Sequence, residues 1–146
     1  IYIINPRLTK TYRNLEHYGH PEKILCDVEK QIHRKILLQT KTLILTPRYL
    51  VELSDDVCAI IPLPEVLWIY DHAAMRRTIK GRQLSYTIHV VTMKGEEYTL
   101  TGKSHREVSA IYHELNTRYP NFFFGYSKEH QEMVQYVLHE MKNEKV

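Results

Sequence analysis

The sequence predicts an α+β protein in which about seven short, mostly antiparallel strands are closed by one amphipathic helix. Three observations support this fold class. Apolar and polar residues alternate in short runs between Lys35 and Gly102, which is the pattern of half-buried strands. Short turns separate these runs, which favours an antiparallel meander over parallel strands joined by helices. A capping box at Ser104 and Glu107 then opens a stretch with an apolar stripe at helical spacing.

Two short helices are expected before the strands. Asn5 and Pro6 are typical of a helix start, and Gly19 ends that helix. Pro21 begins a second helix, in which apolar residues recur at helical spacing up to Ile32. We therefore interpret residues 1–34 as an N-terminal helical segment.

Strands are expected at residues 36–38, 42–46, 49–53, 57–61, 66–70, 84–90 and 97–101. The run at 84–90 alternates most regularly between apolar and polar residues. The segment at 76–83 is interpreted as a basic loop or hairpin tip, because it contains four basic residues and the dipeptide Lys80-Gly81.

Two further helices are expected after the strands. The helix from Ser104 carries an apolar stripe that needs burial against a sheet, and Pro120 ends it. A compact apolar run at 122–124 follows, and Gly125 breaks it. Ser127 then caps a final helix that extends to Met141.

Composition excludes several classes of protein. Hydrophobic residues make up 43% and charged residues 25%, which are ordinary values for a globular chain and argue against disorder. A formal net charge of +3 is too small to predict a nucleic-acid binder. The two cysteines, Cys26 and Cys58, lie in apolar stretches, so we expect buried free thiols and, from them, a reducing cytoplasm.

The first residues allow two interpretations. Ile1-Tyr2-Ile3-Ile4 is either the last turn of a transmembrane helix or a strand stub or frayed end. Basic residues follow at positions 7, 10 and 13, as expected on the cytoplasmic flank of a membrane helix. The membrane interpretation predicts attachment at the cytoplasmic face of the cell membrane, and the other predicts a cytoplasmic protein.

Several stretches give the chain a family resemblance. They are NPRL at 5–8, YRNLEHYG at 12–19, PE at 21–22, LILT at 43–46, IPL at 61–63, VLWIY at 66–70 and FGYS at 124–127. Together they resemble an uncharacterised bacterial family with a pleckstrin-homology-like (PH-like) domain, often preceded by an N-terminal membrane helix.

The resemblance implies a fold rather than a chemistry. It implies a PH-like seven-stranded antiparallel barrel at 35–119, capped by the helix from Ser104, with residues 1–34 before it and a helical extension at 120–146. It also strengthens the membrane interpretation of residues 1–4. The resemblance brings no catalytic residues and no cofactor.

No catalytic or metal-binding constellation is predicted. The nine histidines form no zinc-protease motif, and neither cysteine belongs to a Cys-x-x-Cys pair. The adjacent acids Asp55-Asp56 and Glu96-Glu97 lie beside expected turns, where carboxylates remain solvated. Solvated histidines, an inert Cys58 thiol and solvated acids are therefore the expected state, with neither metal nor cofactor.

One charge cluster stands out, formed by Arg76, Arg77, Lys80 and Arg82. A basic loop on a PH-like domain attracts anionic lipid headgroups. The alternative interpretation is a hairpin tip that only keeps the protein soluble. Lys103 and Arg106 are further basic residues considered for this cluster.

The first functional hypothesis is therefore a non-enzymatic PH-like interaction or scaffold module, tethered to the membrane, with a protein partner that the sequence does not identify. The second is a peripheral binder of anionic lipid headgroups that uses the four basic residues. The third is an enzyme with an unrecognised site, which a deep pocket lined by Cys58 or by several histidines would support. No nucleic-acid partner is expected.

Overall fold

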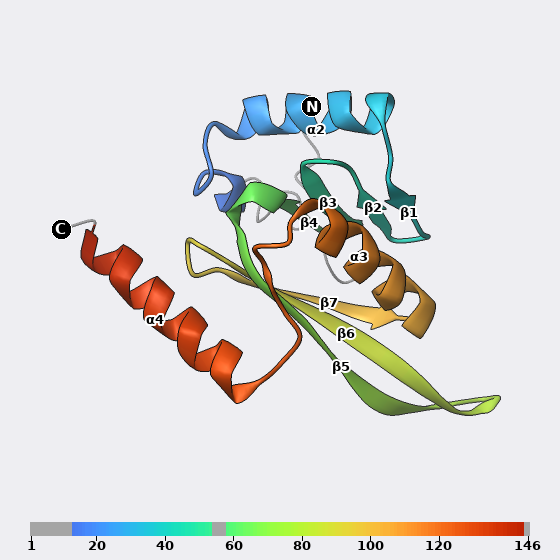
Figure 1. Ribbon diagram of the computed structural model, residues 1–146. Coiled ribbons are helices and arrows are strands. Elements are labelled where there is room, and N and C mark those ends of the chain that lie inside the picture. Colours follow the sequence, from blue (N-terminus) through green and yellow to red (C-terminus); the bar gives the residue numbers. More distant parts are fainter. Residues whose placement is uncertain (1–12, 54–57, 145–146) are drawn as a thin grey trace. The chain divides into compact units, whose positions relative to one another are not determined.

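The computed structural model describes residues 13–53 and 58–144 (Figure 1). The chain divides into two compact units, one that ends at Glu65 and one that begins at Val66. This division falls inside the segment 35–119 that the sequence predicts as one domain. The predicted start of the first helix at Pro6, the acids Asp55 and Asp56, and the predicted membrane anchor at 1–4 all lie outside the described residues.

The described part of the first unit contains a long helix, a short 3-10 helix and a small antiparallel sheet. Its elements are α2 (Pro21–Arg34), β1 (Leu38–Gln39), β2 (Leu43–Leu45), β3 (Tyr49–Leu53), β4 (Cys58–Pro62) and the 3-10 helix η1 (Leu63–Glu65). The strands follow one another in the order β1-β2-β3-β4, each antiparallel to its neighbour. Pro21 begins α2 where its missing N–H costs nothing.

The core of the first unit lies between α2 and the sheet. Val28 of α2 packs with Leu15, Val51 and Ile60, all of which are buried. Tyr49 joins the same cluster, and its hydroxyl donates a hydrogen bond to Asp27 Oδ2 over 2.6 Å. The prediction that Cys26 is buried is wrong, because this free cysteine of α2 is exposed.

The second unit is a four-stranded sheet with two helices. Its elements are β5 (Val66–Thr78), β6 (Gly81–Thr92), β7 (Glu97–Lys103), α3 (His105–Arg118), β8 (Phe123–Phe124) and α4 (Lys128–Glu144). The strand order is β7-β6-β5-β8. The pairs β5–β6 and β6–β7 are antiparallel, whereas β8 runs parallel to β5 beside Trp68 and Ile69.

The two helices of this unit pack on opposite faces of its sheet. Tyr112 of α3 donates its hydroxyl to Asp71 Oδ1 over 2.5 Å, whereas Val134 of α4 packs with Trp68 and Val91. Adjacent residues of a strand point to opposite faces. The odd positions of β5 from Ile69 onward and the even positions of β6 therefore share the α3 face. The even positions of β5 and the odd positions of β6 share the α4 face.

The α+β class and the antiparallel strands are confirmed. Seven strands, β1 to β7, lie where the sequence predicts strands, and the capping box joins Ser104 and Glu107 at the start of α3. The described strands form two sheets of four, so a closed PH-like barrel remains a prediction. Two details were wrong: β5 and β6 extend far beyond the predicted runs at 66–70 and 84–90, and the sequence analysis did not foresee the short strand β8.

Candidate functional site

The predicted basic loop is a regular β-ribbon. We call residues 73–86 the ribbon; it joins the ends of β5 and β6 (Figure 1). Its pairs run from Ala73 opposite Tyr86 to Thr78 opposite Gly81, and a two-residue turn, Ile79-Lys80, closes it. Neither β7 nor β8 pairs beyond the first pair of the ribbon, because β7 ends opposite Tyr86 and β8 reaches only Ile69. The ribbon is therefore two-stranded and projects from the sheet.

All four predicted binding residues lie in this ribbon. Arg77 stands directly opposite Arg82, and Lys80 occupies the turn. Arg76 lies on β5 opposite Gln83. The side chains of Arg77, Lys80 and Arg82 are exposed. The sequence identified the hairpin tip correctly, but three of these residues belong to strands rather than to a loop.

Large apolar side chains lie exposed among these cations. Ile79 at the turn is fully exposed, with a relative accessibility of 107%. Met75 and Leu84 face each other across the ribbon and are 62% and 53% exposed. On the face that these two residues share, the next pair toward the tip is Arg77 and Arg82. The end of the ribbon thus combines an apolar tip with a collar of positive charge.

Acidic residues are missing from this part of the chain. The sequence contains no Asp or Glu between Asp71 and Glu96. Among the described residues, no ion pair includes Arg77, Lys80 or Arg82. The positive charge of the ribbon is therefore not neutralised within the part of the chain that the structure describes.

Lys103 and Arg106 do not join this cluster. Lys103 is buried at the end of β7, where it stands opposite Tyr86, and Arg106 lies in the first turn of α3. Both are set back from the tip, because Tyr86 belongs to the first pair of the ribbon and Ile79 to its turn. The candidate interface is limited to the ribbon itself.

A second group of polar residues occupies the α4 face near the base of the ribbon. We call Tyr70, His72, His89 and Glu97 the histidine cluster. His89 Nε2 lies 2.9 Å from His72 Nδ1, and His89 Nδ1 lies 3.4 Å from Glu97 Oε1. The Tyr70 hydroxyl donates to Glu97 Oε1 over 3.1 Å, and the Tyr70 ring stacks on that of His89 with centroids 4.7 Å apart.

The environment of this cluster shifts two of its pKa values. Burial lowers the pKa of His89 below its ordinary value of 6.5, and His72 lowers it further, whereas Glu97 opposes the change. Burial raises the pKa of Tyr70 to about 12, and the Glu97 carboxylate adds to this shift. The cluster is not apparent in the sequence, because His72 and His89 lie 17 positions apart and only the strand register brings them together.

The histidine cluster lacks the parts of a metal centre. Within residues 13–53 and 58–144, no three or more His, Cys, Asp or Glu side chains converge so that they could hold a metal ion. Glu97 approaches the ring nitrogen of His89 that points away from His72. The arrangement can share a proton between the two imidazoles, but it does not present three donors to one point.

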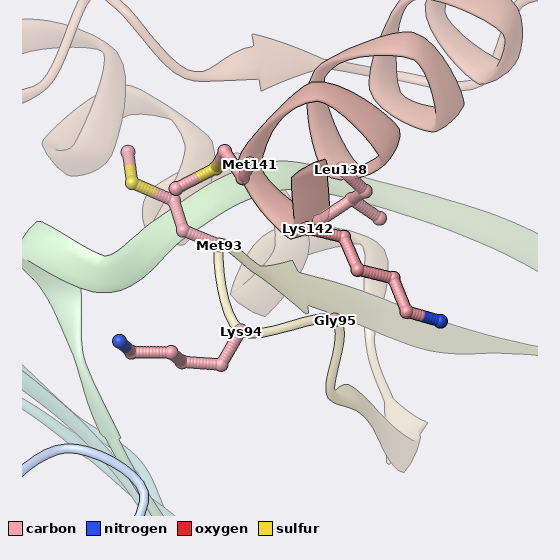
Figure 2. A pocket seen from close by; sticks show the side chains of 6 residues that line it. All are labelled: Met93, Lys94, Gly95, Leu138, Met141 and Lys142. Atoms are coloured by element: carbon pink, nitrogen blue, oxygen red, sulfur yellow. The ribbon is translucent and has the colours of Figure 1, made fainter. Parts of the chain in front are cut away.

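A shallow cavity of about 330 Å³ lies between α4 and the turn that joins β6 to β7. Figure 2 shows Met93, Leu138 and Met141 between the turn and the helix, with the amino groups of Lys94 and Lys142 pointing away in opposite directions. The lining contains no acid, hydroxyl or thiol group. Its lining is mainly apolar, with two lysines at the margin.

Comparison with known proteins matches the chain to a family. A family model described as "Domain of unknown function (DUF6709)" matches residues 25–134. No curated protein and no solved structure matches the chain. Among the described residues, no helix has the length and apolar character needed to cross a membrane.

Proposed function

Because the chain belongs to this family of domains of unknown function, we propose a function from its own surface: it is a non-enzymatic, PH-like interaction module that docks on an anionic membrane through its ribbon. The single observation that carries the proposal is the ribbon tip, where exposed Ile79 is surrounded by exposed cations without a neighbouring acid. The site of action is the cytoplasmic face of the cell membrane.

The charges of the ribbon match those of an anionic bilayer. Each Lys or Arg near such a surface contributes about 1 kcal/mol of attraction. Arg77, Lys80 and Arg82 together supply roughly 3 kcal/mol, or more than about 100-fold in a binding constant. This attraction fades beyond a Debye length of about 8 Å at physiological salt, so it acts only when the ribbon itself meets the membrane.

The apolar tip argues against a merely solubilising hairpin. A hairpin that serves only to keep a protein soluble gains nothing from a fully exposed Ile79 or from Met75 and Leu84 paired in solvent. In the interfacial region of a bilayer, burial of Ile79 alone contributes roughly 1.5–3 kcal/mol. A cationic collar with an apolar tip has the chemistry of an interfacial anchor.

Two weak attachments support each other in this proposal. Stable membrane association usually needs two signals, such as one hydrophobic anchor and one basic patch. The ribbon offers both within one hairpin, because exposed Ile79 is apolar and Arg77, Lys80 and Arg82 form a basic patch. The ribbon would then set how the domain faces the lipid.

Vesicle co-sedimentation tests the proposal. The protein is mixed with vesicles of phosphatidylcholine alone or with 30% phosphatidylserine, and the test variant replaces Arg76, Arg77, Lys80 and Arg82 with Glu. The matched control replaces four other basic residues with Glu, so that both variants have the same net charge. These residues, all exposed in the same unit, are Lys94, Arg118, Lys128 and Lys142.

We expect the wild-type protein to bind the anionic vesicles and not those of phosphatidylcholine alone. The ribbon variant should lose at least about 100-fold in affinity, whereas the control should lose much less. Equal losses in the two variants would mean that net charge rather than the ribbon drives binding. Absence of wild-type binding at low salt would reject the proposal.

A further inference from the structure

The outer edge of β5 is only partly covered. The short strand β8 pairs with Trp68 and Ile69, and the Gly125 N–H donates to the Ile69 carbonyl over 2.8 Å. From Asp71 onward, no strand in the described part of the chain pairs with this edge. An unpaired strand edge presents backbone donors and acceptors to any extended segment that approaches it.

The sequence of this edge is complementary to itself. When two copies of residues 71–77 run antiparallel with Ala74 opposite Ala74, Asp71 of each copy stands opposite Arg77 of the other. The remaining pairs are His72 with Arg76 and Ala73 with Met75. Residues directly opposite in an antiparallel pair share a face, and opposite charges there attract. Because of the symmetry, the Asp–Arg pair forms twice.

The side chains near the symmetry axis leave room for a second strand. Ala73 and Ala74 are small and exposed, so two backbones can approach without a bulky obstacle. Asp71 Oδ1 accepts the Tyr112 hydroxyl, and a carboxylate has capacity for further bonds to a guanidinium. The seven-residue register also ends before Tyr70, so it leaves the edge beside β8 and Gly125 untouched.

We infer that β5 docks against β5 of a second copy of this chain, in an antiparallel register centred on Ala74, which joins two four-stranded sheets into one. The twofold axis is then perpendicular to the sheet, so the α3 faces of both copies lie on the same side. A slip by one residue would instead bring opposite faces together and separate Asp71 from Arg77. The inference concerns assembly in solution and does not depend on the proposed membrane binding.

A dimer held by one short strand pair is weak. Seven residues a side form a contact at the low end of specific interfaces. We therefore expect a monomer–dimer equilibrium that sedimentation velocity detects at tens to hundreds of micromolar protein, without any lipid. Failure of vesicle binding would leave this equilibrium unchanged, and loss of the dimer would leave single-copy membrane binding possible, so the two proposals fail separately.

Charge exchange tests the register. Asp71→Arg places Arg opposite Arg77, and Arg77→Asp places Asp opposite Asp71, so each variant alone should be monomeric at concentrations where the wild type dimerises. An equimolar mixture of the two variants restores both ion pairs and should restore the dimer. Dimerisation of either variant alone at the wild-type level would overturn the register.

Cysteine cross-linking provides the second test, because Asp71→Arg also loses the bond from Tyr112. In a Cys26→Ser background, Ala74→Cys places one thiol opposite its own copy, whereas Thr78→Cys does not. Mild oxidation should give a disulfide-linked dimer at least tenfold faster at position 74 than at position 78 and than in the background alone. Equal rates at the two positions would overturn the inference.

Discussion

The near half of the β5–β6 hairpin (residues 66–72 and 87–92) and its far half (the ribbon, residues 73–86) share one hydrogen-bonded ladder. Their surroundings are opposite. In the near half, Ile69 stands opposite Val90, and both side chains are fully buried. In the far half, Met75 stands opposite Leu84, and these are 62% and 53% exposed. The ladder is continuous between these two pairs, so backbone pairing alone does not decide where the core ends.

Helix coverage accounts for the difference. The near half lies between α3, which bonds to Asp71, and α4, which packs on Trp68. Isolated two-stranded hairpins are marginal in water, so the far half depends on the near half as its base. Its own apolar side chains contribute little to the core, which leaves them available for binding.

The largest expected effect compares two positions on the same face of β6. Ile88→Ala should lower the free energy of unfolding by about 2–5 kcal/mol, because it leaves a cavity in a fully buried site. Leu84→Ala, four residues nearer the tip, should change it by less than about 0.5 kcal/mol, because its side chain is already exposed.

Urea unfolding followed by circular dichroism measures both variants. Similar losses at the two positions would contradict the division of the hairpin into a buried near half and an exposed far half. A loss confined to Ile88→Ala would place the boundary between the buried and the exposed half between Leu84 and Ile88.

A smaller effect is expected where α3 begins. The Ser104 side chain accepts from the Glu107 N–H over 3.2 Å, and the Glu107 carboxylate accepts from the Ser104 N–H over 3.3 Å. Ser104→Ala removes this cap and should cost about 1 kcal/mol of stability. Ser109→Ala, at an exposed position within the same helix, should cost nothing measurable. Thermal unfolding of the two variants checks the contrast, and equal stabilities would mean that the cap does not support the near half.

Sequence reasoning succeeded where short-range signals specify the structure. Strand β3 covers residues 49–53 as predicted, and the cap at Ser104 was read directly from its spacing to Glu107. It failed where long-range pairing decides. The far half of β5 carries polar residues and small alanines on both faces, so it lacks the period-two apolar pattern that predicts a strand. Only its pairing with β6 extends the strand there.

The candidate site was predicted in part for the same reason. The basic residues were visible as a cluster in the sequence, but the exposure of Ile79 and the pairing of Met75 with Leu84 required the register. The histidine cluster and the parallel strand β8 join residues far apart in the chain. A buried thiol was predicted at Cys26 because Ile24 and Leu25 precede it, but residues adjacent in sequence occupy different positions around α2, and Cys26 is exposed.

The smallest expected effect is a pH dependence in the near half. Because the pKa of His89 in the folded state lies below 6.5, the unfolded chain binds more protons there near pH 6. Stability should therefore be fully present above pH 6.5 and should decrease as the pH falls toward the lowered folded pKa. His89→Gln should flatten this part of the profile, and Leu84→Ala should not. An unchanged slope in His89→Gln between pH 7.5 and 5.5 would show that His89 does not carry the effect.

The central claim, that the far half of the hairpin is the part that meets the membrane, is tested most directly by Ile79→Trp. The wild-type chain has one tryptophan, Trp68, which is buried in the near half and serves as the internal control. Emission is recorded as the protein is titrated with anionic vesicles that contain brominated lipid. We expect a blue shift and strong quenching for Ile79→Trp, with little change for the wild type. Unquenched, unshifted emission from position 79 under conditions where the protein sediments with the vesicles would contradict it.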